Sequence, residues 1–139
     1  MPTGAAHFSG SCLCRSCVYQ IDGGIEPAGV CHCEDCRKVT GGPFGVSFRV
    51  PKDRFHITGR TASYSKPADS GTVLTRHFCP VCGSPLYTES GAHADAVYVK
   101  AGTLDQPEAI TIERQAWLAS AVAWAAIPPG VATYQKGRI

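Results

Sequence analysis

The sequence lacks the features that would place this protein in a membrane, outside the cell or on nucleic acid. No apolar run approaches the roughly 18 residues that a membrane-spanning helix needs. The N-terminal residues contain no basic stretch followed by a hydrophobic one, so we expect no signal peptide and a cytoplasmic protein. Charged residues are only 17% of the chain, and among the basic ones only Arg37 and Lys38 adjoin, so we expect no nucleic-acid partner.

Cysteine is the residue type that the chain does have in abundance. Seven of the eight cysteines fall into three tight clusters, namely Cys12 and Cys14, then Cys31, Cys33 and Cys36, then Cys79 and Cys82. Thiolates two or three residues apart can converge on one metal ion, whereas disulfide cysteines are usually scattered. Seven ligands are enough for a closed tetrahedral zinc site and a second zinc with three ligands and an open position. Seven thiolates and two Zn²⁺ would bring the formal charge from +2 to about −1.

The spacing of the cysteines favours one partition and permits another. Cys12 and Cys14 share a face if they lie on a strand, and Gly83 would relieve the turn that aims Cys79 and Cys82 at the same ion. We therefore assign these four to a structural zinc and Cys31, Cys33 and Cys36 to a second zinc. The alternative pairs Cys33 and Cys36 with Cys79 and Cys82. It needs 42 intervening residues, against the usual 15–20 of a zinc ribbon.

The rest of the chain predicts a mainly β fold in a single domain of residues 1–139, with few short helices. A short helical turn is expected at 35–40. Alternation between polar and apolar residues, bounded by glycines and prolines, predicts strands at 18–21, 44–50, 73–78, 96–101 and 110–113.

Three residues beside the second cysteine cluster are candidates for a substrate pocket. Arg37 would compensate the negative charge of a thiolate-bound zinc, and Thr40 and Phe44 lie in the loop that follows the cluster. Two others are interpreted as structural. Cys17 reads as a small buried hydrophobic residue, and His32, between two ligands, should face away from the metal.

Four motifs in order resemble the glutathione-dependent formaldehyde-activating enzyme family, which includes centromere protein V-like domains. They are Gly-Ser-Cys-Leu-Cys (10–14), Cys-His-Cys-Glu-Asp-Cys-Arg-Lys-Val-Thr-Gly (31–41), Phe-Cys-Pro-Val-Cys-Gly (78–83) and Ala-Gly-Thr-Leu-Asp (101–105). The resemblance covers about residues 10–124 and leaves 125–139 as a C-terminal segment outside it. Arg15 stands where most members have glycine.

The resemblance implies a β-tent fold of zinc-stapled antiparallel sheets and two zinc ions. Cys12, Cys14, Cys79 and Cys82 match the structural ligands, and Cys31, Cys33 and Cys36 match the catalytic ones. The implied activity is that of a carbon–sulfur lyase, in which a small thiol such as glutathione is joined to formaldehyde. The alternative is a zinc-stabilised binding module without turnover, as the centromere-like relatives suggest.

Overall fold

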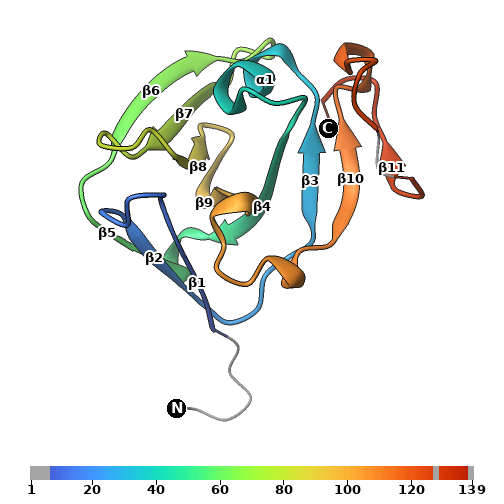
Figure 1. Cartoon of the computed structure of the whole chain (residues 1–139). Coiled ribbons are helices and arrows are strands. Elements are labelled where there is room, and N and C mark those ends of the chain that lie inside the picture. Colours follow the sequence, from blue (N-terminus) through green and yellow to red (C-terminus); the bar gives the residue numbers. More distant parts are fainter. Residues whose placement is uncertain (1–6, 127–128, 138–139) are drawn as a thin grey trace.

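Eleven strands in two sheets form the framework of residues 7–126 and 129–137, the part of the chain that the computed structural model describes (Figure 1). The smaller sheet has the order β1-β2-β5, and both of its pairs are antiparallel. Its strands are β1 (His7–Ser11), β2 (Val18–Asp22) and β5 (Phe55–Thr58).

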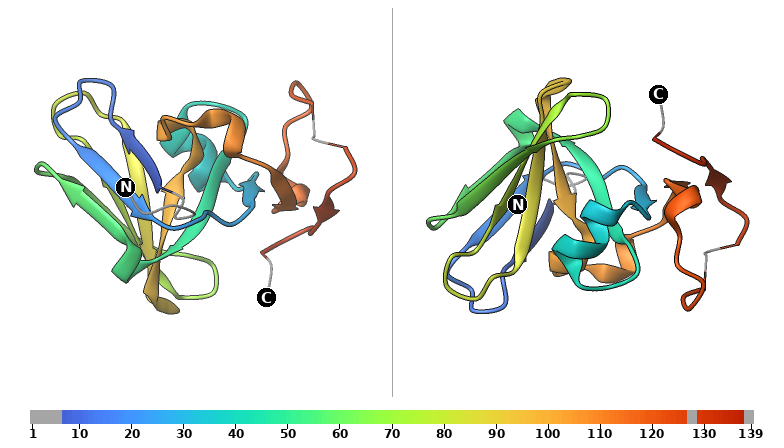
Figure 2. Two further views of the ribbon diagram at one scale, coloured as in Figure 1. Left: turned by 90° about the horizontal axis from the view of Figure 1, so that it is seen from below. Right: turned by 90° about the horizontal axis from the view of Figure 1, so that it is seen from above.

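The larger sheet has the order β11-β10-β3-β4-β9-β8-β7-β6. It is antiparallel from β3 to β6, while β10 pairs in parallel with both β3 and β11. The three-stranded sheet and the β10–β11 edge lie on opposite sides of the molecule (Figures 1 and 2). The eight strands are β3 (Ala28–Cys31), β4 (Gly45–Pro51), β6 (Ala62–Pro67), β7 (Val73–Phe78), β8 (Pro85–Ser90), β9 (His93–Lys100), β10 (Ile112–Ala116) and β11 (Ala132–Thr133).

Helical structure within the described residues is confined to short segments. The α-helix α1 (Glu34–Thr40) connects β3 to β4, and 3₁₀ turns lie at Lys52–Arg54, Ala101–Thr103, Pro107–Ala109 and Leu118–Ser120. The mainly β prediction is therefore confirmed. None of these segments combines the length and apolar character that a membrane-crossing helix requires.

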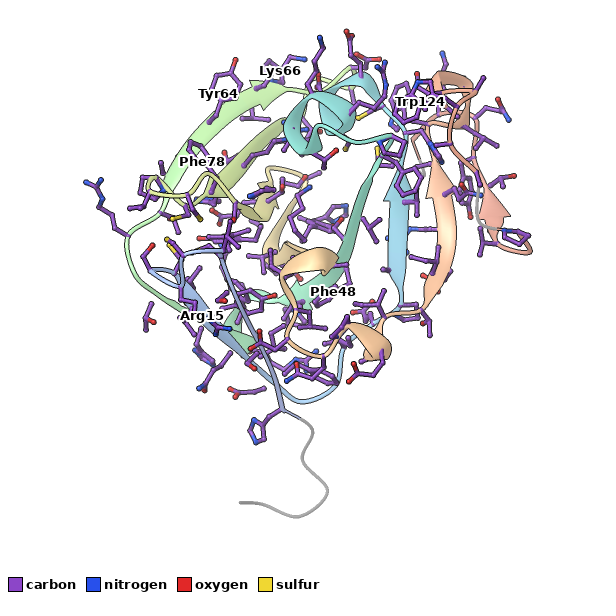
Figure 3. The ribbon with its side chains drawn as sticks, in the orientation of Figure 1. Arg15, Phe48, Tyr64, Lys66, Phe78 and Trp124 are labelled. Atoms are coloured by element: carbon purple, nitrogen blue, oxygen red, sulfur yellow. The ribbon has the colours of Figure 1, made fainter. Side chains whose placement is uncertain are left out.

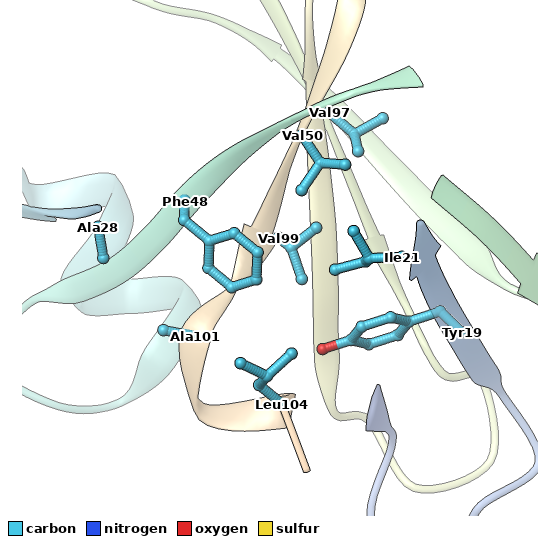
Figure 4. Close-up of a cluster of buried hydrophobic side chains, with 9 residues drawn as sticks. All are labelled: Tyr19, Ile21, Ala28, Phe48, Val50, Val97, Val99, Ala101 and Leu104. Carbon is cyan, nitrogen blue, oxygen red and sulfur yellow. The ribbon is translucent and has the colours of Figure 1, made fainter. Parts of the chain in front are cut away.

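The main core lies where the two sheets face each other. Phe48 and Val99 from the larger sheet and Tyr19 and Ile21 from the smaller one point into the same space (Figure 4). All four are completely buried. Burying such side chains contributes about 1.5–3 kcal/mol each relative to leaving them exposed, so this contact holds the two sheets together.

The Ala-Gly-Thr-Leu-Asp segment connects the two sheets by polar contacts as well. The Tyr19 hydroxyl lies 2.7 Å from Thr103 Oγ1, and Ser9 Oγ donates to Asp105 Oδ2 at 2.9 Å. Gly10 lies where these segments cross. A Cβ at this position would overlap the Tyr19 hydroxyl and the Thr103 carbonyl oxygen, so only glycine fits. Two of the four sequence motifs thus meet at one sheet-to-sheet contact.

Candidate metal centres

Four cysteines come together where the β1–β2 loop lies beside the β7–β8 loop (Figure 1). The sulfurs of Cys12, Cys14, Cys79 and Cys82 all lie within 4.8 Å of one another. Two of the separations are 3.7 Å, from Cys14 Sγ to Cys12 Sγ and from Cys14 Sγ to Cys79 Sγ. Zinc–sulfur bonds of about 2.3 Å in a tetrahedron place sulfurs about 3.8 Å apart. The four sulfurs therefore fit a zinc ion.

A hydroxyl and two backbone N–H groups favour the thiolate form of Cys79. Cys79 Sγ accepts from the N–H groups of Val81 and Cys82, at 3.3 and 3.4 Å. The Ser16 hydroxyl, 3.2 Å from the same sulfur, contributes most to lowering the pKa of Cys79 to about 5. Gly83, at φ +81°, adopts the left-handed conformation that closes this turn and that glycine favours, as the sequence predicts.

Two serines that were not predicted from the sequence contact the four-cysteine cluster. Ser16 Oγ lies 3.2 Å from Cys14 Sγ as well as from Cys79 Sγ, so it contacts sulfurs from both loops. Ser84 Oγ lies 3.2 Å from Cys82 Sγ and accepts from the Leu13 N–H at 3.0 Å. Hydroxyls beside ligands orient them and stabilise their charge. Each serine lies within two residues of a cysteine in the sequence, and this was the feature from which their contact with the cluster could have been predicted.

The second cluster forms at the junction of β3 and α1. Cys31 ends β3, Cys33 is the N-cap of α1 and Cys36 lies in its first turn. Their sulfurs also lie within 4.8 Å of one another. Cys33 Sγ accepts from the Cys36 N–H at 3.3 Å, in the role that a serine or aspartate side chain usually has at a helix start. Three convergent sulfurs suit a zinc ion with one open position.

Contacts among the three sulfurs shift their pKa values in opposite directions. Cys33 accepts hydrogen bonds from Cys31 and Cys36, which lowers its pKa, and the same bonding raises the pKa of Cys31. The geometry also decides between the two partitions of the cysteines. Cys79 and Cys82 lie with Cys12 and Cys14, not with Cys33 and Cys36.

Two basic residues provide positive charge beside the three-cysteine cluster. Arg76 on β7 contributes to lowering the pKa of Cys33, and Lys100 at the end of β9 partly offsets the rise in the pKa of Cys36. Burial lowers the pKa of Lys100. The predicted source of positive charge was Arg37 instead. Lys100 lies near the end of the mostly apolar segment Ala96–Ala101, and a charged residue in such a segment needs a partner. This was the one sequence feature that indicated a role for Lys100.

A cavity of about 170 Å³ lies between α1 and the face of β6–β9. Asp35 on α1 forms an ion pair with Lys66 on β6 at 2.7 Å, which holds the helix over that face. Figure 3 places Tyr64, Lys66 and Phe78 on this side of the molecule. Residues that line the cavity include Val39, Tyr64, Arg76, Phe78, Thr88 and Lys100.

The three residues predicted to form the pocket lie elsewhere around α1. Thr40 Oγ1 donates to the Cys36 carbonyl at 2.9 Å and accepts from the Gly42 N–H at 3.1 Å, so it organises the end of the helix. The Phe44 ring meets His32 edge-on, 5.2 Å between centroids. Arg37 Nε is buried without a hydrogen-bond partner among the described residues. A substrate role for these three stays a prediction.

The remaining candidates behave as structural residues. His32 is buried and shares a hydrogen bond of 2.9 Å with Gln115 Oε1, so it faces away from the cysteines. Cys17 is completely buried against Leu86, and its thiol donates to the Arg60 carbonyl at 3.3 Å. Burial raises the pKa of Cys17 to about 11, which makes it a poor nucleophile.

Comparison with known proteins agrees with the geometry. Over residues 7–120 the chain matches the family described as glutathione-dependent formaldehyde-activating enzyme. The fold also resembles a crystal structure of a Rhodobacter sphaeroides protein, with a TM-score of 0.58 and 13% sequence identity. That match covers 91% of this chain and 98% of the other, and at this identity it supports the fold alone.

Proposed function

Because the chain belongs to the family of glutathione-dependent formaldehyde-activating enzymes, we propose that it is a zinc-dependent enzyme of carbon–sulfur lyase type that joins a small thiol to an aldehyde. The observation that carries this proposal is the separation of the cysteines into two unlike clusters. Four sulfurs suffice for a closed site, whereas Cys31, Cys33 and Cys36 leave a fourth position for a substrate.

The reaction forms a carbon–sulfur bond. The thiol sulfur attacks the carbonyl carbon of the aldehyde, the carbon–oxygen double bond becomes single, and the thiol proton ends on the new hydroxyl. Zinc bound by three thiolates would either ionise a thiol near neutral pH or polarise a carbonyl oxygen. Arg76 and Lys100 lie beside the three cysteines, and their positive charge would favour the thiolate form of a thiol bound there.

The four-cysteine cluster has a different part in this proposal. Its loops belong to β1–β2 in the smaller sheet and to β7–β8 in the larger one, so a zinc ion there would cross-link the two sheets. β7 and β8 carry residues that line the cavity beside the second cluster. All eight cysteines are free, and we propose a reducing cytoplasmic setting, in which zinc-binding thiolates persist.

The test is exchange NMR with glutathione and formaldehyde, compared with the same mixture without protein. Zinc-loaded protein should accelerate exchange between free and adduct glutathione. Cys36→Ser should abolish the acceleration while the protein stays folded. Cys17→Ala, which removes a cysteine outside both clusters, should keep it.

The same experiment separates the alternative of a zinc-stabilised binding module. A binding module would hold two zinc ions without accelerating exchange for glutathione or for several smaller thiols. That result, in protein shown to contain both metals, would overturn the enzyme proposal.

A further inference from the structure

We propose that the cavity between α1 and β6–β9 binds the carboxylate group of a small acid, held by Arg76, Thr88 and Lys100. That the other end of this ligand is a thiol or its aldehyde adduct rests on the proposed function. Binding of the carboxylate can be measured independently of it. The consequence is that this protein would select small thiol acids over neutral thiols of the same size.

Strand register places the polar residues of the cavity on one face. Arg76 on β7 pairs directly with Tyr64 on β6 and with Thr88 on β8. Directly paired residues point to the same side of a sheet. Thr88 in turn pairs with Tyr98 on β9, and Lys100 lies two residues further along that strand, again on the same face. Three neighbouring strands thus each contribute one polar group.

Thr88 supplies evidence that a ligand completes this face. The residue is only 8% exposed and lines the cavity, yet its Oγ1 is buried and has no hydrogen-bond partner among the described residues. Buried hydroxyls in native proteins nearly always have a partner, and leaving one unmet is unfavourable. A carboxylate oxygen in the cavity would accept the missing hydrogen bond.

The charges of the cavity favour an anion. Within residues 7–126 and 129–137, no carboxylate forms an ion pair with Arg76 or Lys100. Before a thiol binds, three thiolates and one Zn²⁺ carry −1 together, which is less than the two positive charges of Arg76 and Lys100. An arginine fork matches the two oxygens of a carboxylate in particular.

The size of the cavity limits the acid. A volume of about 170 Å³ is below the roughly 300–1,000 Å³ of pockets for drug-sized ligands. Apolar and aromatic walls from Val39, Tyr64 and Phe78 suit a short hydrocarbon chain. An acid of a few carbons therefore fits, whereas a whole tripeptide would have to extend outside the cavity.

The test uses three probes of similar size on the zinc-loaded full chain, with binding measured by calorimetry. 3-Mercaptopropionate has both a thiol and a carboxylate, 3-mercaptopropionamide lacks the charge, and propionate lacks the thiol. The acid thiol should bind at least about tenfold more tightly than the amide. Arg76→Gln and Thr88→Val should remove that preference, and Arg60→Gln, the same charge change outside the cavity, should preserve it.

Thr88→Val adds a readout that a merely structural residue would not give. Because the substitution removes an unpaired buried hydroxyl, it should raise the melting temperature of the unliganded protein while it weakens acid binding. A fall in both quantities would count against the proposal.

The outcomes distinguish the two proposals. Equal binding of acid and amide thiols, unaffected by Arg76→Gln, would overturn the carboxylate site and leave the thiol chemistry standing. Binding of propionate that depends on Arg76, with no contribution from the thiol, would support the carboxylate site and contradict the proposed function. Absence of binding by all three probes would overturn both.

Discussion

Cys14 and Cys79, separated by 65 positions in the chain, have sulfurs 3.7 Å apart. This contact joins a loop of the smaller sheet to a loop of the larger one, and Cys79 belongs to a different buried cluster from Tyr19 and Phe48. The cysteines thus connect the two sheets in addition to the core and to the polar contacts of Thr103 and Asp105.

Removal of one of these sulfurs should therefore affect the whole fold. We expect Cys79→Ala to lose one zinc per chain and its cooperative unfolding transition, because metal binding at a structural site is coupled to folding. Cys36→Ser should also lose one zinc but keep the transition. Thermal unfolding with metal analysis checks both. Wild-type melting and full metal content in Cys79→Ala would refute the structural assignment.

Arg15 occupies a backbone conformation that suits glycine. Its φ is +66°, in the turn where its N–H donates to the Cys12 carbonyl at 3.2 Å. A residue with a Cβ is disfavoured in this conformation by roughly 1–2 kcal/mol relative to glycine. Glycine also makes the unfolded chain more flexible, which offsets part of this advantage. Arg15→Gly should therefore stabilise the protein by about 0.5–1 kcal/mol.

The matched control is Arg15→Ala, which removes the guanidinium but keeps the Cβ. Denaturant unfolding should show a gain for glycine and none for alanine. Equal gains from both would mean that the side chain, not the backbone, is the unfavourable element.

Tyr19 should give a pH-dependent difference in stability. Thr103 Oγ1 donates to the Lys100 carbonyl, so the Tyr19 hydroxyl is the donor in its 2.7 Å bond to Thr103. Burial raises the pKa of Tyr19 to about 12, whereas a tyrosine in the unfolded chain ionises near 10. The folded protein therefore favours the neutral phenol, and this stability is present below pH 10 and lost as the pH rises towards 12.

Tyr19→Phe removes both the bond and the ionisation. We expect it to be less stable than the wild type by about 1 kcal/mol at pH 8. The deficit should shrink by about 1.4 kcal/mol per pH unit above 10. Urea unfolding at several pH values checks this, with Tyr64→Phe, on a side chain 63% exposed, as the control. A deficit constant to pH 11 would show that Tyr19 ionises as easily in the fold as outside it.

Local patterns in the sequence predicted the strands that show clear alternation. The segment 73–78 is β7 as predicted, 44–50 matches β4 within one residue at each end, and the turn expected at 35–40 is α1. β6 (Ala62–Pro67) and β8 (Pro85–Ser90) were not predicted, because each contains a proline and β6 is largely exposed. Such strands owe their structure to neighbours in the sheet rather than to their own residues.

The cysteine clusters could be predicted because their ligands are close in sequence and chemically distinctive. Arg76, Thr88 and Lys100 could not, because only the pairing of β7, β8 and β9 brings them to one face. The parallel contact of β10 with β3 was also outside the reach of local patterns, since it joins segments about 85 residues apart.

The measurement that tests the account most directly is a chelator titration that follows zinc content, thiol binding and thermal unfolding in the same samples. The account predicts two steps. At low chelator concentration the first zinc should dissociate and glutathione binding should be lost, while the unfolding transition persists. The reason is that Cys31, Cys33 and Cys36 offer only three ligands. The second should leave at higher chelator as the protein unfolds. Loss of both zinc ions in a single step, together with the fold, would contradict the division into a structural and a reactive site.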